Sequence, residues 1–176
     1  MGTGLRPCVG CGAPVPDEAG PTHRYLGASP GCWRLYGEVL GREYEDYARF
    51  APVHRLTVDA YAAQHPGEPS PQSIGSVGVH LVRLHFQFER GLPHDRANDA
   101  MLEISSRLKK NFVWLEPPAS LGDATVLDVL DAREPEEHIE RVREWAASVW
   151  GAWAPHHETV RRWASEGGYP KIASGR

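Results

Sequence analysis

The sequence contains few cysteines, no long apolar run and no excess of positive charge, and each absence excludes a class of protein. No apolar segment approaches the roughly 20 residues that a membrane-spanning helix needs. Residues 1–7 contain no apolar core of the kind that secretory signals have. We therefore expect a protein without membrane contact that is located in the cytoplasm.

The charge balance argues against a nucleic-acid partner. Nineteen Lys and Arg residues stand against 23 Asp and Glu residues, which gives a net charge of −4 with histidine neutral. The basic residues are scattered or lie next to acidic ones, as in residues 140–144, so no basic surface is expected to attract phosphates. A small molecule or a protein remains as the expected partner, and the sequence does not identify it.

What the sequence does contain indicates one helical domain. The 176 residues are 41% hydrophobic and include six Trp and six Tyr, enough to build a single core without disulfides. Apolar residues recur at helical spacing along most of the chain, and no series of strands is apparent. The predicted fold class is all-α: an irregular helical bundle with an N-terminal Cys-rich zinc-knuckle loop.

Proline and glycine mark the expected helix boundaries. Ser29 is a suitable N-cap, followed by Pro30 at the first helical position. Pro52 is expected to begin a second helix that ends at His65. Further helices are expected over about 73–90, 98–108, 125–130 and 134–164, the last one kinked at Pro155 because proline removes a hydrogen bond. The domain division is then residues 1–31 as a zinc-knuckle loop packed on the bundle, 32–166 as the bundle and 167–176 as a tail, within one domain overall.

Three cysteines predict a metal site near the N-terminus. An odd number of cysteines in a reducing compartment favours a metal over disulfides. Cys8 and Cys11 can bind one ion only if the chain turns tightly between them, which the neighbouring Gly10 and Gly12 permit. Cys32 lies in the first turn of the first helix, where the helix dipole stabilises a thiolate. We predict that these three cysteines bind Zn²⁺.

The fourth ligand is expected to be a histidine, and two are available. His23 is nearest in sequence and lies in the same loop. His65 ends the second helix, which should run antiparallel to the first and so return toward Cys32. The second helix is shorter by roughly 10 Å at 1.5 Å per residue, so this match is imperfect.

Other interpretations of the cysteines stay open. Two could be free in a loop while the third is a core residue. A redox Cys-x-x-Cys is disfavoured because no strand precedes it. Cys32 alone could act as a nucleophile activated by its helix N-terminus, although the spacing fixes no base beside it.

A second group of polar residues predicts a pocket. His54, Asp59, His80 and His157 are the candidate catalytic residues, because helices that pair as hairpins could bring Asp59 or His54 opposite His80. His157 follows the Pro155 kink. Such a cluster could bind a second metal or perform acid–base chemistry. The alternative is that each residue is satisfied separately within the core. His85, His94 and His138 are expected at the surface.

Three sequence runs carry a resemblance to a known family. They are VHRLTVDAYAAQHPG (53–67), SVGVHLVRL (76–84) and VWGAWAPHHETVRRW (149–163), together with the N-terminal CxxCG and the later cysteine. In these the chain resembles an uncharacterised bacterial family, one of the groups of domains of unknown function. The resemblance implies a small stand-alone protein with the same cysteine arrangement, and no activity. A weaker similarity to four-helix metal-dependent thiol transferases is not carried over, since Arg161 stands where their paired histidine would be.

The function that these observations favour is a small helical protein whose zinc is structural and whose His/Asp pocket takes a small molecule or a partner. The alternative is a metal-dependent hydrolase or group transferase. Such an enzyme would use either the His/Asp cluster or an open coordination position on the zinc.

Overall fold

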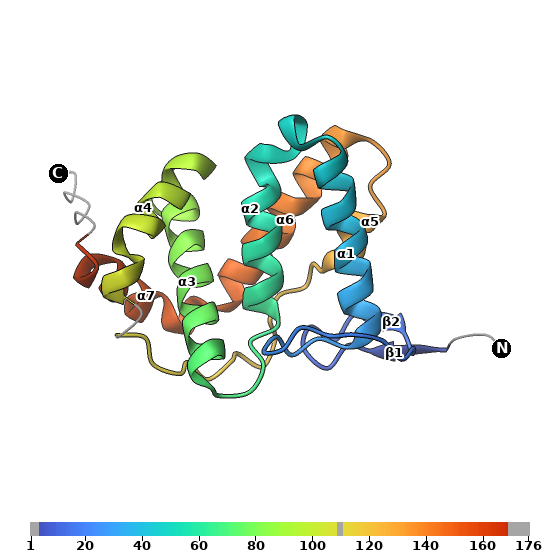
Figure 1. The fold of residues 1–176 in the computed structure, drawn as a ribbon, viewed down its shortest axis with the longest axis horizontal. Helices are drawn as coiled ribbons and strands as arrows, with labels where there is room; N and C mark the ends of the chain where they lie inside the picture. The colour runs from blue at the N-terminus through green and yellow to red at the C-terminus, as the bar shows by residue number, and fades with distance from the viewer. Residues whose placement is uncertain (1–3, 109–110, 169–176) are drawn as a thin grey trace.

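A computed structural model describes residues 4–108 and 111–168 of the chain, and it confirms the all-α fold class. Within these residues seven α-helices accompany one short β-hairpin (Figure 1). The elements are β1 (Leu5–Pro7), β2 (Pro14–Pro16), α1 (Pro30–Glu45), α2 (Tyr47–Gln64), α3 (Pro71–Phe88), α4 (His94–Leu108), α5 (Val126–Leu130), α6 (Pro135–Ala152), a 3₁₀ turn η1 (Ala154–His156) and α7 (His157–Glu166).

Helices α1 and α2 form an antiparallel pair joined only by Asp46. The prediction that Pro52 begins the second helix was wrong, because α2 starts at Tyr47 and carries Pro52 in its second turn. Phe50 is buried in the added turn, and burying its ring offsets the one hydrogen bond that the proline removes. The earlier start gives α2 18 residues against 16 in α1, so the end of α2 reaches the start of α1.

Helix α2 occupies the centre of the bundle and packs against α1, α3 and α6 (Figure 1). Because α2 is central, polar side chains on several of its faces are buried against neighbouring helices, which explains why its sequence mixes polar and apolar residues without a clear polar face. The tryptophans of the C-terminal third fill the core, and Trp145, Trp153 and Trp163 are all almost completely buried. These three rings anchor α6 and α7 on the rest of the bundle.

The expected long helix over 134–164 is two helices. Pro155 breaks it rather than kinking it, and η1 separates α6 from α7. A break leaves carbonyl groups near the end of α6 without helical donors. The carbonyl oxygen of Trp150 accepts from the backbone N–H of Trp153 at 3.1 Å and from Nε2 of His157 at 2.9 Å, and the His157 ring stacks on that of Trp150.

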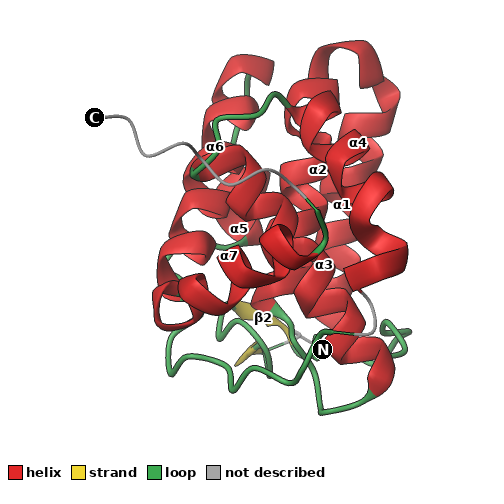
Figure 2. Ribbon diagram, turned by 90° about the vertical axis from the view of Figure 1, so that its left-hand side faces the viewer, coloured by secondary structure: helices red, strands yellow, loops and turns green. Residues whose placement is uncertain are grey.

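Two strands appear where none was expected. β1 and β2 pair antiparallel with Leu5 opposite Pro16 and Arg6 opposite Val15. The hairpin lies at the N-terminal end of α1, at the same end of the bundle as the connection between α2 and α3 (Figures 1 and 2). Its turn carries the Cys8 to Cys11 segment, so the hairpin sets the position of that segment.

Other boundaries differ by a few residues from expectation. Helix α3 begins at Pro71, after Ser70 accepts a hydrogen bond from the backbone N–H of Ser73, and α4 begins at His94. Of the tail predicted for residues 167–176, residues 169–176 lie outside the described part of the chain.

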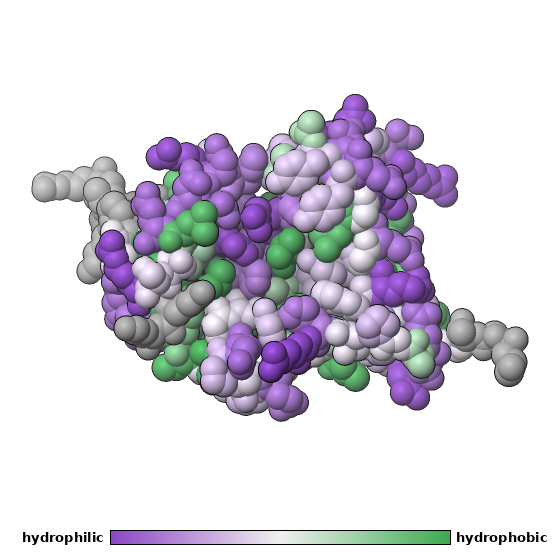
Figure 3. Space-filling model, in the orientation of Figure 1, coloured by the Kyte–Doolittle hydropathy of each residue, from purple (hydrophilic) through white to green (hydrophobic). Residues whose placement is uncertain are grey.

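No helix in the described ranges is long and apolar enough to cross a membrane. The face shown in Figure 3 is mainly hydrophilic, with small separated hydrophobic areas.

Candidate metal centre

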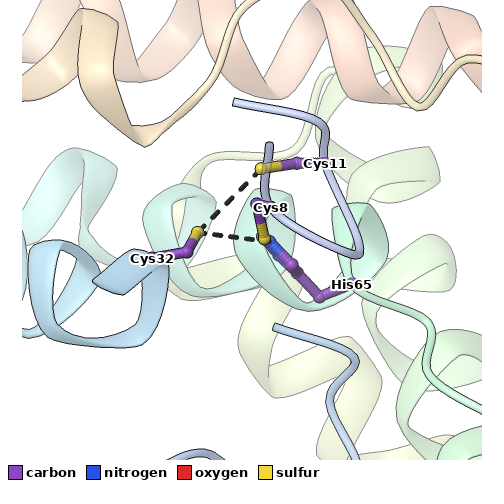
Figure 4. Close-up of side chains that lie close together, drawn as sticks. All are labelled: Cys8, Cys11, Cys32 and His65. Carbon is purple, nitrogen blue, oxygen red and sulfur yellow. Dashed lines mark hydrogen bonds between the residues drawn. The ribbon is translucent and has the colours of Figure 1, made fainter. Parts of the chain in front are cut away.

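Three separate segments bring four ligand-type side chains together. Cys8 and Cys11 come from the turn of the β-hairpin, Cys32 from the first turn of α1, and His65 from the residue that caps α2. One ligand atom of each lies within 4.8 Å of all the others, and the four side chains point toward a common centre (Figure 4). This Cys₃His cluster could hold a metal ion.

The distances inside the cluster are short and similar. The Nε2 of His65 lies 3.6 Å from Cys8 Sγ and 3.4 Å from Cys32 Sγ. Cys11 Sγ lies 3.9 Å from Cys32 Sγ. Cys8, Cys32 and His65 are buried, and Cys11 is half-buried. The cluster is therefore almost closed to water, with Cys11 as its outer member.

The orientation of His65 suits a metal ligand. Its Nδ1 lies 2.8 Å from the carbonyl oxygen of Tyr61, to which it donates a hydrogen bond. This bond places the proton of the neutral imidazole on Nδ1 and leaves the lone pair of Nε2 directed at the three sulfurs. The ring also stacks on Tyr61, with centroids 4.1 Å apart. The imidazole is thus held by its neighbours in one tautomer and one orientation.

Two of the sulfurs accept hydrogen bonds from outside the cluster. The backbone N–H of Ser29 donates to Cys8 Sγ at 3.4 Å, and the hydroxyl of Tyr61 donates to Cys32 Sγ at 3.6 Å. Ser29 occupies the expected N-cap position of α1, but its side chain makes no capping hydrogen bond. Its hydroxyl instead accepts from the backbone N–H of Val9 at 3.0 Å, which ties the hairpin turn to the start of α1.

Electrostatics in the cluster favour a cation. Hydrogen bonds from Cys11 and then Cys32 lower the pKa of Cys8 far below its ordinary value, whereas Cys11 and Cys8, with burial, raise the pKa of Cys32. Burial lowers the pKa of His65, but hydrogen bonds with Cys11 and Cys8 outweigh it and raise that pKa to about 9. Without a cation, the three sulfurs therefore compete for negative charge. A bound metal ion would displace the protons and neutralise the thiolates together.

The glycines of the turn are needed for close approach. A Cβ on Gly10 would lie 2.2 Å from the carbonyl oxygen of Gly27 and 2.5 Å from Cδ2 of His65. Gly12 has a φ of 74°, in the left-handed region that side chains disfavour. The predicted roles of both glycines in the turn agree with this geometry.

His23, the rival for the fourth position, lies outside the cluster. Its ring packs on Tyr25 and Trp33, and its Nδ1 accepts a hydrogen bond from the backbone N–H of Tyr25 at 3.5 Å. Burial lowers the pKa of His23. The structure thus places His65, and not His23, beside the three cysteines.

The four candidate catalytic residues do not form one pocket. Asp59 and His80 do meet, with His80 Nδ1 2.7 Å from Asp59 Oδ1. The described contacts of His54 and His157 are with other groups, in two other parts of the bundle. The expected cluster is therefore reduced to the Asp59–His80 pair.

Arg83 completes the surroundings of that pair. Its guanidinium contacts Asp59 Oδ1 at 2.6 Å and approaches His80 Nδ1 to 2.9 Å. Asp59 is fully buried, and its second oxygen, Oδ2, has no hydrogen-bond partner among the described residues. Burial lowers the pKa of His80, although its hydrogen bond with Asp59 opposes the shift. His80 also lines a surface cavity of about 380 Å³ between the start of α3 and Tyr25.

His54 belongs to a network that sequence reasoning missed. Its Nδ1 lies 2.7 Å from Oε2 of Glu43, a fully buried carboxylate on α1. Thr57 and His138 donate to the other oxygen of Glu43. Burial raises the pKa of Glu43, but the hydrogen bonds from His138, His54 and Thr57 outweigh it and lower that pKa. Arg42 then joins His138 Nδ1 to the carbonyl groups at the end of α5.

A signal for this network was present in the periodicity. Glu43 continues the buried stripe of α1 that runs through Tyr36 and Val39, and His138 lies four residues before the buried Val142. His138 is buried, so the expectation that it lies at the surface was wrong. His85 is buried as well, with its Nδ1 3.0 Å from Glu89.

His157 joins α3 to α7. Its Nδ1 lies 3.5 Å from Glu89, whose two carboxylate oxygens also accept hydrogen bonds from Nε and Nη2 of Arg161 at 2.7 Å. The hydrogen bond from Arg161 lowers the pKa of Glu89. The helix break and the contact with Glu89 therefore explain the position of His157 in the fold.

Together, the fold and the site define a helical-bundle protein with a Cys₃His cluster that could hold a metal ion. The chain belongs to DUF5946, a family of unknown function, whose model matches residues 6–154. The resemblance to a family of unknown function is confirmed, and the matched range includes all four members of the cluster. No curated protein and no solved structure matches the chain.

Proposed function

We propose that this protein binds one structural Zn²⁺ ion through Cys8, Cys11, Cys32 and His65. The observation that carries the proposal is the spacing of the ligand atoms. Zinc–sulfur bonds of about 2.3 Å and zinc–nitrogen bonds of about 2.0–2.1 Å, in a tetrahedron, separate sulfurs by about 3.8 Å and sulfur from nitrogen by about 3.6 Å. Here Cys11 Sγ lies 3.9 Å from Cys32 Sγ, His65 Nε2 lies 3.4 and 3.6 Å from the sulfurs of Cys32 and Cys8, and all the ligand atoms lie within 4.8 Å of one another.

The ligand set favours a structural over a catalytic ion. Catalytic zinc sites have three protein ligands and keep the fourth position for water or substrate, whereas structural sites fill all four positions. Here four protein donors surround the centre, and three of them are buried. The outer bonds from Ser29 and Tyr61 hold ligands in place, as supporting hydrogen bonds do around metal sites.

The ion would fix the hairpin to the bundle. All three residues of β1 are exposed, and of the three residues of β2 only Val15 is buried. Such a hairpin buries too little apolar surface to be stable alone. Zinc would bond its turn directly to the start of α1 and the end of α2, so that metal binding contributes to folding free energy.

The test is metal content by elemental analysis of the untagged natural protein and of three variants, two at histidines and one at a cysteine. We expect one zinc per chain in the natural protein and in His23→Ala, and loss of the zinc in His65→Ala and Cys11→Ser. Retention of full metal content by Cys11→Ser, or its loss from His23→Ala alone, would overturn the assignment.

A second candidate function is supported by the cavity beside His80. We infer that this cavity binds a small molecule. Its size lies within the range of ligand pockets. The Nδ1 of His80 is engaged by Asp59 and Arg83, at 2.7 and 2.9 Å. A buried carboxylate oxygen without a partner among the described residues, as for Asp59 Oδ2, is uncommon and leaves an acceptor free for a bound group.

Fragment screening by ligand-observed NMR tests this inference. Fragments that bind the natural protein should lose binding to His80→Gln and keep it with His94→Gln, which replaces a histidine at the start of α4. If the two variants bind the same fragments, the cavity is not a binding site.

A further inference from the structure

The three sulfurs of the cluster differ in their access to solvent. Cys32 is fully buried and Cys8 almost so, whereas Cys11 is half-buried at the outer side of the hairpin turn. Cys11 is therefore the one residue of the three with a substantial part of its surface open to solvent. This difference matters because a thiolate reacts only with what can approach it.

The sulfurs also differ in their hydrogen bonds. Cys8 accepts from the backbone N–H of Ser29, and Cys32 accepts from the hydroxyl of Tyr61. The contacts of Cys11 Sγ among the described residues are with other members of the cluster only. A hydrogen-bond donor withdraws electron density from a thiolate, so the sulfur without one remains the most nucleophilic. Access and hydrogen bonding thus single out the same residue.

We propose that Cys11 is a modification site: it is the thiolate of the metal-loaded cluster that reacts with hydrogen peroxide. Its sulfur attacks one peroxide oxygen, the O–O bond breaks, hydroxide leaves and Cys11 becomes a sulfenic acid. The proposal rests on the proposed zinc site, because the zinc holds all three sulfurs as thiolates near neutral pH.

Cys32 completes the reaction. Its Sγ lies 3.9 Å from Cys11 Sγ, and a disulfide needs about 2.05 Å, so a movement of about 2 Å in the hairpin turn closes the bond. The Cys32 thiolate attacks the oxidised sulfur of Cys11, the S–S bond forms and a second hydroxide leaves. Each sulfur loses one electron, the peroxide gains two, and the two hydroxides take protons from solvent. The ion loses two ligands and is released, and the hairpin loses its link to the bundle.

The first test is labelling of zinc-loaded protein with less than one equivalent of iodoacetamide, which forms a C–S bond and releases iodide. Fragmentation mass spectrometry distinguishes Cys8 from Cys11 within their shared peptide. We expect the first label on Cys11 in most molecules. The reference is the same protein unfolded in urea with a chelator, where the three thiols have equal access. The same label distribution in folded and unfolded protein, or a first label on Cys8 or Cys32, overturns the proposal.

The second test treats zinc-loaded protein with hydrogen peroxide and follows metal release with a chromophoric chelator. Zinc should appear in step with a Cys11–Cys32 disulfide, and a reductant added with zinc should restore the starting state. A Cys8–Cys11 disulfide, or oxidation without release of zinc, contradicts the second step. If the purified protein lacks zinc and cannot be loaded with it, the proposed zinc site itself is wrong. If zinc-loaded protein reacts equally at all three thiols, only the assignment of Cys11 is wrong.

Discussion

The imidazole Nδ1 of His65 lies 2.8 Å from the carbonyl oxygen of Tyr61, one helical turn earlier in α2. The same Tyr61 donates its hydroxyl to Cys32 Sγ and stacks its ring on His65. One residue therefore supports two of the four proposed ligands, through its backbone and through its side chain. This relationship makes Tyr61 the most informative position for testing what surrounds the ion.

Tyr61→Phe is expected to weaken zinc binding. The substitution keeps the stacked ring and the backbone carbonyl, and it removes only the hydroxyl that donates to Cys32. Loss of a supporting bond to a metal ligand typically costs about 10–100-fold in affinity. Competition with a chelator of known affinity measures the change. Tyr36→Phe is the control, since Tyr36 stacks on Tyr61 but has no described bond to a ligand sulfur. Equal zinc affinity in the two variants would contradict the role given to the hydroxyl.

Gly10→Ala is expected to displace the hairpin turn from the cluster. The new methyl group would meet the Gly27 carbonyl oxygen at 2.2 Å and the His65 ring at 2.5 Å, distances that no side chain tolerates. We expect lower zinc content and a lower melting temperature. Gly37→Ala is the matched control, because its methyl group would meet nothing within 4 Å on the exposed side of α1. That change should stabilise the protein by about 0.5–1 kcal/mol. A Gly10→Ala variant with full zinc content and unchanged stability would show that the turn can move without loss.

Glu43→Ala is expected to lower the free energy of unfolding strongly. It leaves His54, Thr57 and His138 without their buried acceptor, at about 1–3 kcal/mol for each unpaired donor. Urea unfolding monitored by tryptophan fluorescence measures the loss. Glu38→Ala, on the exposed face of the same helix, should change stability by less than about 0.5 kcal/mol. Similar effects of the two substitutions would mean that the buried network contributes little.

His80→Gln is expected to reduce the sensitivity of the protein to mild acid. The pKa of His80 is lowered by burial, so the unfolded chain, with an ordinary histidine pKa of about 6.5, takes up a proton where the folded chain does not. The contribution of His80 to stability is therefore complete above about pH 6.5 and is lost as the pH falls toward the lowered value. We expect a smaller difference in free energy of unfolding between pH 8 and pH 6 in the variant. His94→Gln is the control and should keep the difference of the natural protein. If His80→Gln also keeps it, His80 makes no such contribution to stability.

The helices could be predicted from the sequence because apolar spacing and proline positions are local signals. Their limits show where local signals fail. Pro52 is unfavourable inside a helix, yet the burial of Phe50 in the turn before it offsets that cost. The hairpin was missed because its strands have three residues each and bury almost nothing, so they show no alternation of apolar residues.

The sequence by itself determined the three cysteine positions of the candidate centre, since a tight Cys-x-x-Cys turn with glycines and a cysteine in a first helical turn are set by neighbouring residues. Only the tertiary structure decided between His23 and His65, because that choice depends on how far α2 extends alongside α1. It also decided that His54, Asp59, His80 and His157 belong to three different networks, and that Glu43 lies between His54 and His138. The periodicity indicates that Glu43 and His138 are buried, but the residues they contact depend on how helices distant in sequence pack.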